Sequence, residues 1–274
     1  MLPLFKDVLH VGLFADRIVL VREGGGLGTR SQLQTSVPLD PGSSVDAMLD
    51  VLQEQLKDAR WHNAQAYVQL SGVLVSYTIV QASQQPLSAA EELALAQLKL
   101  RQMHGSVAGE REVRLANPLQ GQDQIAAALE SSFVKRLQEL LAGAKLRLRS
   151  MQPLLMHAFN RMRHQMESVD YWFALAEPGL LTLARWQGGW RSLSAITLDG
   201  ALEEALPMRL QQARLMSSAS SDSNRVYLYS PGVDSRACGS SEDLELITLK
   251  DLHFPDPLAA ALDASLAIEP ALED

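Results

Sequence analysis

The feature that most constrains the fold is an order of predicted elements that occurs twice along the chain. Apolar alternation and turn residues predict three short strands, then a helix, then strands that alternate with helices. The same order starts again after Glu167. Each half then forms a mixed sheet, in which three antiparallel strands are extended by parallel strands through crossover helices. We therefore predict an α/β protein with two similar lobes.

The first predicted lobe covers residues 1–166. Its strands are expected at 8–13, 16–22, 31–39, 66–70, 124–129 and 145–150, and its helices at 45–58, 133–142 and 154–165. The last of these helices is expected to open at Pro153. An insertion at about residues 73–116 contains two strands and a long helix, which Ser88 and Glu91 begin as a capping box. We predict that this insertion forms a small α+β subdomain of the first lobe.

The second predicted lobe covers residues 167–274. Its strands are expected at 169–176, 180–187, 190–198, 225–230 and 244–249. Asp199 is expected to cap a helix at 201–216, and Pro257 to open a last helix at 258–266. Because proline lacks an N–H and its ring crowds the preceding turn, we expect Pro207 to kink or break the first of these helices.

Charge and cysteine content restrict the classes of function. The 274 residues include 32 acidic and 24 basic side chains, for a net charge of −8, which argues against broad binding to nucleic acid. Basic clusters at 145–150 and 160–164 are interpreted as solvated faces rather than as a nucleic-acid patch, and docking onto an acidic partner or an anionic lipid surface stays open. The single cysteine, Cys238, excludes an internal disulfide, and no apolar run approaches 18 residues. We predict a cytoplasmic protein.

Two local patterns resemble ligand sites but lack essential parts. The glycine cluster at 23–28 resembles a phosphate-binding loop, yet it has no Gly-Lys-Ser/Thr end and leads into a predicted strand rather than a helix. His157 and His164 lie seven residues apart on one predicted helix face, with no acidic or cysteine partner nearby in the sequence. We interpret these histidines as surface or packing residues and predict no metal site.

The doubled element order is similar to that of the actin, Hsp70 and hexokinase superfamily, whose two lobes have ribonuclease H-like folds. Within it, the chain resembles the type IV pilus assembly protein PilM, the cytoplasmic domain of the type II secretion protein GspL, and the corresponding mannose-sensitive pilus protein. The segments that carry the resemblance are VLHVGLFADRIVLV at 8–21, AQAYVQLSGVLVSYTIV at 64–80, and the strand, helix, strand and helix series at 125–162.

The superfamily holds the phosphates of ATP with two hairpins, each opened by an aspartate and followed by glycine. In the first hairpin, Gly12 matches the glycine, but His10 stands where the aspartate is expected. Phe14 and Ala15 replace small polar residues that donate hydrogen bonds to phosphate, and Asp16 is shifted along the hairpin. A histidine with bulky apolar neighbours does not supply the oxygen ligands that Mg²⁺ prefers.

The other two motifs also depart from the superfamily pattern. In the second hairpin, Glu177 and Gly179 flank Pro178, which lacks an N–H that a phosphate would use. In the segment that matches the adenosine-binding turn, only Gly232 remains. We therefore expect a vestigial cleft lined by His10, Gly12, Asp16, Glu177, Gly179 and Gly232, with no cofactor, no metal and no ATP hydrolysis.

The resemblance implies a non-catalytic cytoplasmic scaffold of a pilus or secretion platform. Such a protein binds the cytoplasmic N-terminal segment of a bitopic inner-membrane protein in a groove beside the inserted subdomain, and is peripheral to the inner membrane through that partner. An assembly ATPase and a second copy of the chain are further candidate partners. Two alternatives stay open at this point: an active ATP- and Mg-binding protein of the same fold, and a polymerising division or shape protein.

Overall fold

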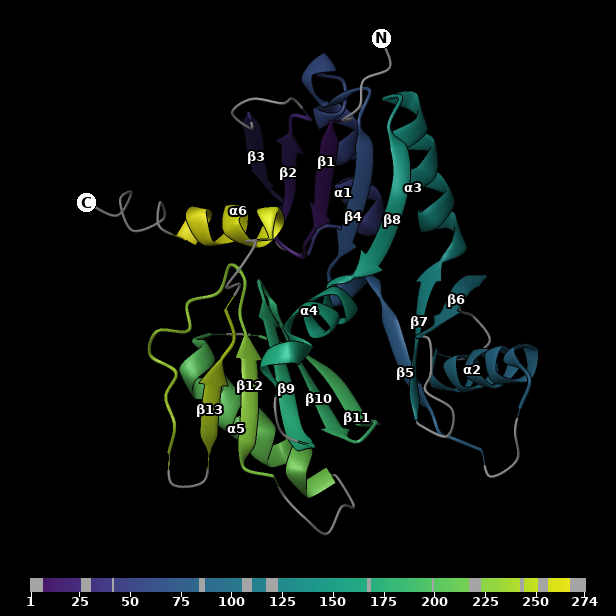
Figure 1. Cartoon of the computed structure of the whole chain (residues 1–274). Helices are drawn as coiled ribbons and strands as arrows, with labels where there is room; N and C mark the ends of the chain where they lie inside the picture. The colour runs from purple at the N-terminus through teal and green to yellow at the C-terminus, as the bar shows by residue number, and fades with distance from the viewer. Residues whose placement is uncertain are drawn as a thin grey trace. The chain divides into compact units, whose positions relative to one another are not determined.

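The computed structural model describes residues 7–25, 31–40, 42–83, 87–104, 110–116, 123–166, 169–198, 200–216, 223–241, 244–250 and 256–266 (Figure 1). The chain divides into two compact units that are interleaved in sequence. The first unit takes Met1–Leu74, Ser132–His157 and Asp251–Asp274, and the second takes Val75–Ser131 and Ala158–Lys250. None of the described helices is both long and apolar enough to cross a bilayer.

The first unit is built on a five-stranded sheet with the strand order β3-β2-β1-β4-β8. Its strands are β1 (Val8–Leu13), β2 (Arg17–Glu23), β3 (Gln32–Pro38), β4 (Gln65–Leu70) and β8 (Arg147–Pro153). Its helices are α1 (Val45–Gln55), α3 (Ser131–Gly143) and α6 (Pro257–Leu266), with the short 3-10 turns η1 (Ala59–Trp61) and η2 (Gly72–Leu74). In Figure 1, α1 lies behind this sheet, α3 lies beside β8, and α6 lies near the lower ends of β2 and β3. α6 packs against β1, β2 and β3.

The elements of the first unit follow from local sequence signals. β1 and β2 bury alternating or continuous apolar side chains, as expected for central strands covered by helices. Ser44 caps α1 by accepting a hydrogen bond from the Ala47 N–H at 3.2 Å. Met48, Leu49 and Leu52 form the buried stripe of that helix.

The second unit contains two sheets. One is five-stranded with the order β11-β10-β9-β12-β13, and the other is three-stranded with the order β5-β7-β6. The five-stranded sheet contains β9 (Asp170–Glu177), β10 (Leu180–Gln187), β11 (Trp190–Thr197), β12 (Arg225–Tyr229) and β13 (Glu245–Thr248). The three-stranded sheet contains β5 (Ser76–Val80), β6 (Arg111–Leu115) and β7 (Gln124–Glu130). The helices are α2 (Ala89–His104) and α5 (Leu202–Met216), and α4 (Leu154–Met162) with η3 (Arg163–Gln165) begins in the first unit and ends in the second.

The two five-stranded sheets have the same topology, which confirms the predicted duplication of a mixed sheet. β1–β2–β3 and β9–β10–β11 are antiparallel meanders. In each case the first strand of the meander also pairs in parallel with a later strand, β4 or β12, which pairs in parallel with an edge strand. The two-lobe α/β prediction is therefore correct at the level of strand order.

The inserted segment groups with the second unit rather than with the first sheet. It is larger than residues 73–116, because β7 is the central strand of its sheet. β5 lies beside β11, and Arg191 Nη1 donates to Asp123 Oδ2 at 2.9 Å. These contacts attach the insertion to the second five-stranded sheet, while the predicted lobe boundary at residue 166 stays a prediction.

Three expectations about helices need correction. The last helix, predicted as part of the second lobe, packs against β1, β2 and β3 of the first sheet. Pro207 lies inside α5 and does not break it, because the buried Leu202, Leu206 and Leu210 hold both sides of the proline on one core, while the expected alternative of a kink stays a prediction. Pro153 ends β8 instead of opening α4. The predicted cap Asp199 lies outside the described residues.

Candidate functional site

The first predicted phosphate hairpin, β1–β2, is closed by apolar packing. Phe14 N donates to Arg17 O at 3.0 Å, which forms the turn. A Cβ atom placed on Gly12 would lie 3.0 Å from Phe14 Cζ, nearer still to Phe14 Cε2, and 3.3 Å from Leu258 Cδ2 of α6. Phe14 is fully buried. The absence of a side chain at Gly12 therefore makes room for a phenyl ring and a leucine, not for a phosphate.

The two polar residues of this hairpin are held by their neighbours. His10 Nε2 lies 3.2 Å from Glu23 Oε2 on β2, and its ring stacks on Tyr67 of β4 with centroids 5.9 Å apart. Asp16 Oδ2 accepts hydrogen bonds from Arg17 Nε at 2.9 Å and Arg17 Nη2 at 2.7 Å. The structure thus gives His10 and Asp16 different partners, and does not bring them together as one ligand set.

The second predicted hairpin, β9–β10, buries its acidic residue. Glu177 is 0% exposed at the end of β9. Burial, together with the negative charge of Glu177, raises the pKa of Tyr77 on β5 well above its usual value. Pro178 and Gly179, which has a φ of 77°, form the two-residue turn in the arrangement typical of a type II turn. The backbone of the turn explains Gly179 without any ligand.

Gly232 has the same explanation. Its φ is 71°, and Val233 N lies 3.4 Å from Ser230 O across the turn that follows β12. Proline at the second position and glycine at the third position are the residues that such a turn favours. The glycine that matches the adenosine-binding segment is thus required by the turn itself.

Comparison with known proteins identifies the fold. No protein-family profile and no curated protein sequence matches the chain. A Bacteroides thetaiotaomicron protein with an actin-like ATPase fold and unknown function is 10% identical, with a TM-score of 0.57 and 84% of each chain covered. The cytoplasmic domain of EpsL, an inner-membrane component of the type II secretion system of Vibrio cholerae, is 11% identical, with a TM-score of 0.51 and 96% and 95% of the two chains covered. A chain of the PilM-PilN type IV pilus biogenesis complex is 17% identical, with a TM-score of 0.53 and 81% of each chain covered.

This chain has the actin-like fold. In an actin-like ATPase site, backbone N–H groups approach the phosphates at the hairpin glycines, and oxygen ligands hold Mg²⁺. Here Phe14 covers Gly12, Pro178 removes a donor, and Glu177 is buried. In the described part of the chain, no group of three or more His, Cys, Asp and Glu side chains is arranged to hold a metal ion. At Gly12 and Pro178, this actin-like chain therefore lacks the open backbone donors that a triphosphate would use.

Sequence reasoning missed a buried acidic residue in the first unit. Asp256 caps α6 by accepting from the N–H groups of Leu258 at 2.9 Å and Ala259 at 3.3 Å. Its other carboxylate oxygen lies 2.5 Å from His157 Nε2 and accepts from Gln69 Nε2 at 2.9 Å. Burial alone would raise the pKa of Asp256, but these hydrogen bonds and the charge of His157 hold it well below its usual range. His157 has an acidic partner after all, one that is distant in sequence.

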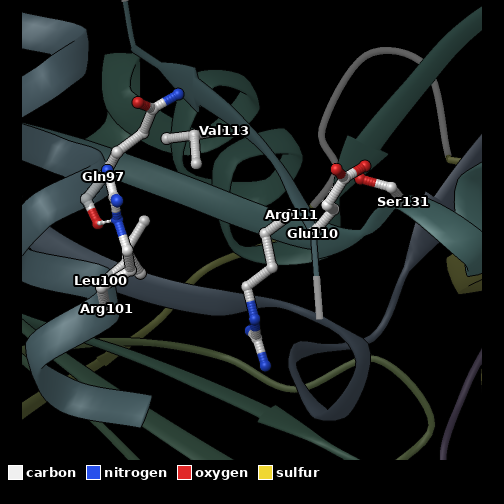
Figure 2. Close-up of a pocket in the computed structure, with 7 residues that line it drawn as sticks. All are labelled: Gln97, Leu100, Arg101, Glu110, Arg111, Val113 and Ser131. Carbon is white, nitrogen blue, oxygen red and sulfur yellow. Dashed lines mark hydrogen bonds between the residues drawn. The ribbon is translucent and has the colours of Figure 1, made fainter. Parts of the chain in front are cut away.

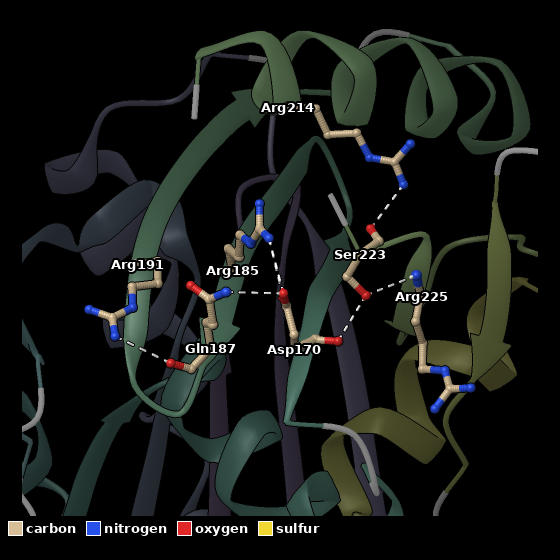
Figure 3. A network of polar contacts seen from close by, with 7 residues as sticks. All are labelled: Asp170, Arg185, Gln187, Arg191, Arg214, Ser223 and Arg225. Atoms are coloured by element: carbon tan, nitrogen blue, oxygen red, sulfur yellow. Dashed lines mark hydrogen bonds and ion pairs between the residues drawn. The ribbon is translucent and has the colours of Figure 1, made fainter. Parts of the chain in front are cut away.

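A second polar network lies at the start of β9 in the second unit (Figure 3). The fully buried Arg185 donates from Nη2 to both carboxylate oxygens of Asp170, at 3.3 and 3.2 Å. Gln187 Nε2 donates to Asp170 Oδ2 at 3.2 Å, and Ser223 Oγ donates to the Asp170 carbonyl at 2.8 Å. The Arg185 guanidinium also lies 5.7 Å from the ring centre of Trp172. This network holds Asp170, the first residue of the central strand β9, in place.

The inserted segment carries a cavity of about 410 Å³ between α2 and the edge strand β6 (Figure 2). The cavity is lined by charged, polar and apolar side chains, among them Gln97, Leu100, Arg101, Glu110, Arg111 and Val113. Its volume lies in the range of sites that bind small molecules or a few side chains of a partner. The resemblance implied a partner groove beside this insertion, without assigning any residue to it.

Proposed function

We propose that this chain is a non-catalytic cytoplasmic scaffold of a type IV pilus or type II secretion-like inner-membrane assembly platform. It docks on the cytoplasmic tail of a bitopic membrane protein and reaches the membrane through that partner. The observation that carries the proposal is the packing of Phe14 and Leu258 over Gly12, where an ATPase of this fold needs open backbone. Buried Glu177 and the proline beside it add to this argument from the second hairpin.

The choice of assembly system is supported by two fold relatives. One is the cytoplasmic domain of an inner-membrane component of type II secretion, and the other belongs to a PilM-PilN complex of type IV pilus biogenesis. Both cover more than three quarters of this chain. A scaffold that has lost phosphate chemistry but kept the actin-like frame is consistent with a role in assembly.

The absence of nucleotide chemistry is tested by thermal unfolding with and without Mg-ATP. A ligand present at 100 times its Kd would stabilise the folded chain by about 2.7 kcal/mol. We expect no change in the unfolding midpoint at millimolar Mg-ATP, and no phosphate release. A rise in the midpoint with Mg-ATP would reject the non-catalytic proposal in favour of an ATP-binding protein.

Partner docking is tested with the genomic neighbour. We expect an adjacent reading frame that encodes a short cytoplasmic tail followed by one transmembrane helix. A synthetic peptide of that tail, titrated calorimetrically into the full chain, is expected to bind, whereas a scrambled peptide of the same composition is not. Equal heats for the two peptides would contradict the scaffold proposal.

A further inference from the structure

The outer edge of β6 pairs with no other described strand, and of its outward groups the Val113 carbonyl accepts a hydrogen bond only from the neighbouring Arg114 Nη1, at 3.4 Å. Ser131 N donates to Glu110 O at 2.9 Å, and Ala116 N donates to Ile125 O at 3.0 Å. Because hydrogen-bonded pairs alternate along an antiparallel ladder, the even-numbered residues of β6 bond to β7, and the odd-numbered residues turn their N–H and C=O groups outward. Among the described residues, no strand pairs with this outer edge.

Two of these odd-numbered residues, Arg111 and Val113, line the cavity. Val113 packs in the cluster formed with Leu100 of α2, and both line the cavity. Arg111 lines it from the next position on the same face. The outward backbone groups of β6 and the cavity under α2 therefore belong to one surface. A strand added to β6 would direct its side chains opposite Arg111 and Val113 to this face.

Arg111 has hydrogen-bonding capacity that the described residues do not use. Its Nη1 donates to Ser76 Oγ at 2.5 Å, and its Nη2 lies 4.0 Å from Glu130 Oε1, at the limit of an ion pair. Its Nε is buried and has no hydrogen-bond acceptor. A buried donor without an acceptor is costly, and a carboxylate is the strongest acceptor for a guanidinium.

The charge of the lining also favours an acidic group. Arg101 donates from Nε to the Gln97 carbonyl at 3.3 Å and forms no ion pair with a described residue. Glu110 is the single acidic residue among the described lining residues, against two arginines. Counted over the lining residues alone, leaving aside Glu130 beside Arg111, this is an excess of one positive charge, which favours a negatively charged occupant.

We propose that the β6 edge and the cavity form one docking site, where an extended segment pairs with β6 and places a carboxylate side chain against Arg111. Backbone pairing supplies affinity, and the cavity supplies selectivity for the acidic side chain. The inference rests on the proposed function only for the source of the segment, the cytoplasmic tail of the membrane partner.

The test uses the full chain and two capped pentapeptides, Ac-Val-Thr-Glu-Thr-Val-NH2 and its counterpart with glutamine in place of glutamate. Both are titrated while the amide signals of β6 and the Nε–H signal of Arg111 are followed by NMR. We expect the glutamate peptide to shift both sets of signals and to bind at least about tenfold more tightly than the glutamine peptide. Arg111→Gln is expected to abolish the difference between the peptides.

Arg236→Gln is the matched control, because Arg236 lies outside the insertion and is 90% exposed in its ion pair with Asp234. We expect it to leave both affinities unchanged. Equal affinity of the two peptides for the unaltered chain, no response of β6 to either peptide, or unchanged preference in Arg111→Gln would overturn the inference. The comparison of peptides on the unaltered chain does not depend on the folding of any variant.

The two proposals can fail separately. If the glutamate peptide binds at β6 but the tail of the neighbouring frame does not bind at all, the docking site stands and the proposed function fails. If that tail binds and Arg111→Gln does not weaken it, the proposed function stands and the site assigned here is wrong.

Discussion

In the β1–β2 hairpin, Gly12 lies under the ring of Phe14 and against Leu258, whereas in the β9–β10 hairpin Gly179 occupies a turn position with a φ of 77°. The two hairpins have the same place in sheets of the same topology. Gly12 is required because a side chain there would overlap Phe14, and Gly179 is required because its backbone has a positive φ. Matching glycines in a duplicated fold therefore need not reflect one inherited ligand.

The polar clusters of the two units differ in how deeply their aspartates are buried and in which segments they connect. In the first unit, Asp256 is 4% exposed in its side chain and joins α6 to β4 and α4 through Gln69 and His157. In the second unit, Asp170 is 23% exposed and holds the buried Arg185 within one sheet. The first cluster links separate segments of the chain, while the second stabilises adjacent strands.

Asp256→Ala is expected to be the most destabilising of these changes. Removing one partner of a buried charge pair costs about 3 to 5 kcal/mol in the free energy of unfolding, and the α6 cap is lost as well. Denaturant unfolding measures the change. Because the pKa of Asp256 is lowered in the folded state, its stabilisation is present above the unfolded pKa of about 3.9 and is lost as the pH falls through and below that value.

The pH dependence supplies a control for this prediction. The natural chain should lose stability between about pH 5 and pH 3 more steeply than Asp256→Asn, which cannot ionise. Identical acid profiles for the two proteins would show that Asp256 does not carry this contribution.

Asp170→Ala is expected to cost about 2 to 3 kcal/mol, less than Asp256→Ala, because Asp170 is partly solvated although Arg185 is fully buried. Urea unfolding of the variant measures the loss. Asp234→Ala, which breaks the exposed pair between Asp234 and Arg236, serves as the matched control and should leave the midpoint unchanged. Equal losses in the two variants would remove the distinction between buried and exposed pairs.

Gly12→Ala is expected to cost about 2 kcal/mol, because its Cβ would overlap the Phe14 ring. A double-mutant cycle with Phe14→Leu measures the coupling, since the smaller side chain gives the new methyl group room. We expect the double variant to be more stable than the sum of the two single costs predicts. Strict additivity would mean that Phe14 is not the residue that requires glycine at this position.

Gly179→Ala is expected to have the smallest effect, about 1 kcal/mol, since the strain comes from the positive φ rather than from a clash. Gly179→Asn should cost less, because asparagine tolerates the left-handed region. Thermal unfolding of both variants provides the comparison. A larger loss for asparagine than for alanine would indicate that space, not conformation, limits this turn.

Much of the secondary structure could be predicted from local pattern. β1, with bounds Val8–Leu13, and β10, with bounds Leu180–Gln187, lie where apolar alternation and turn residues predicted them. The capping box at Ser88 and Glu91 forms as expected, with Glu91 N donating to Ser88 Oγ at 3.3 Å. Pro207 does not break α5, because the packed leucines outweigh the loss of one backbone hydrogen bond.

The candidate site was less predictable. The lack of an aspartate at His10 is visible in the sequence, but the burial of Glu177 and its effect on Tyr77 depend on how the insertion packs against the second sheet. No acidic partner of His157 could be predicted from the sequence, because Asp256 is far away along the chain. Interactions between such distant positions leave no periodic signal.

The sequence by itself determined the doubled strand order and the departures from a phosphate-binding hairpin, because periodicity and turn chemistry act within a few residues. Only the tertiary structure decided that Phe14 and Leu258 fill the space over Gly12, that α6 belongs with the first sheet, and that Arg111 faces a cavity at an open strand edge. The physical reason is that packing density and unsatisfied polar groups are properties of side chains brought together from separate segments.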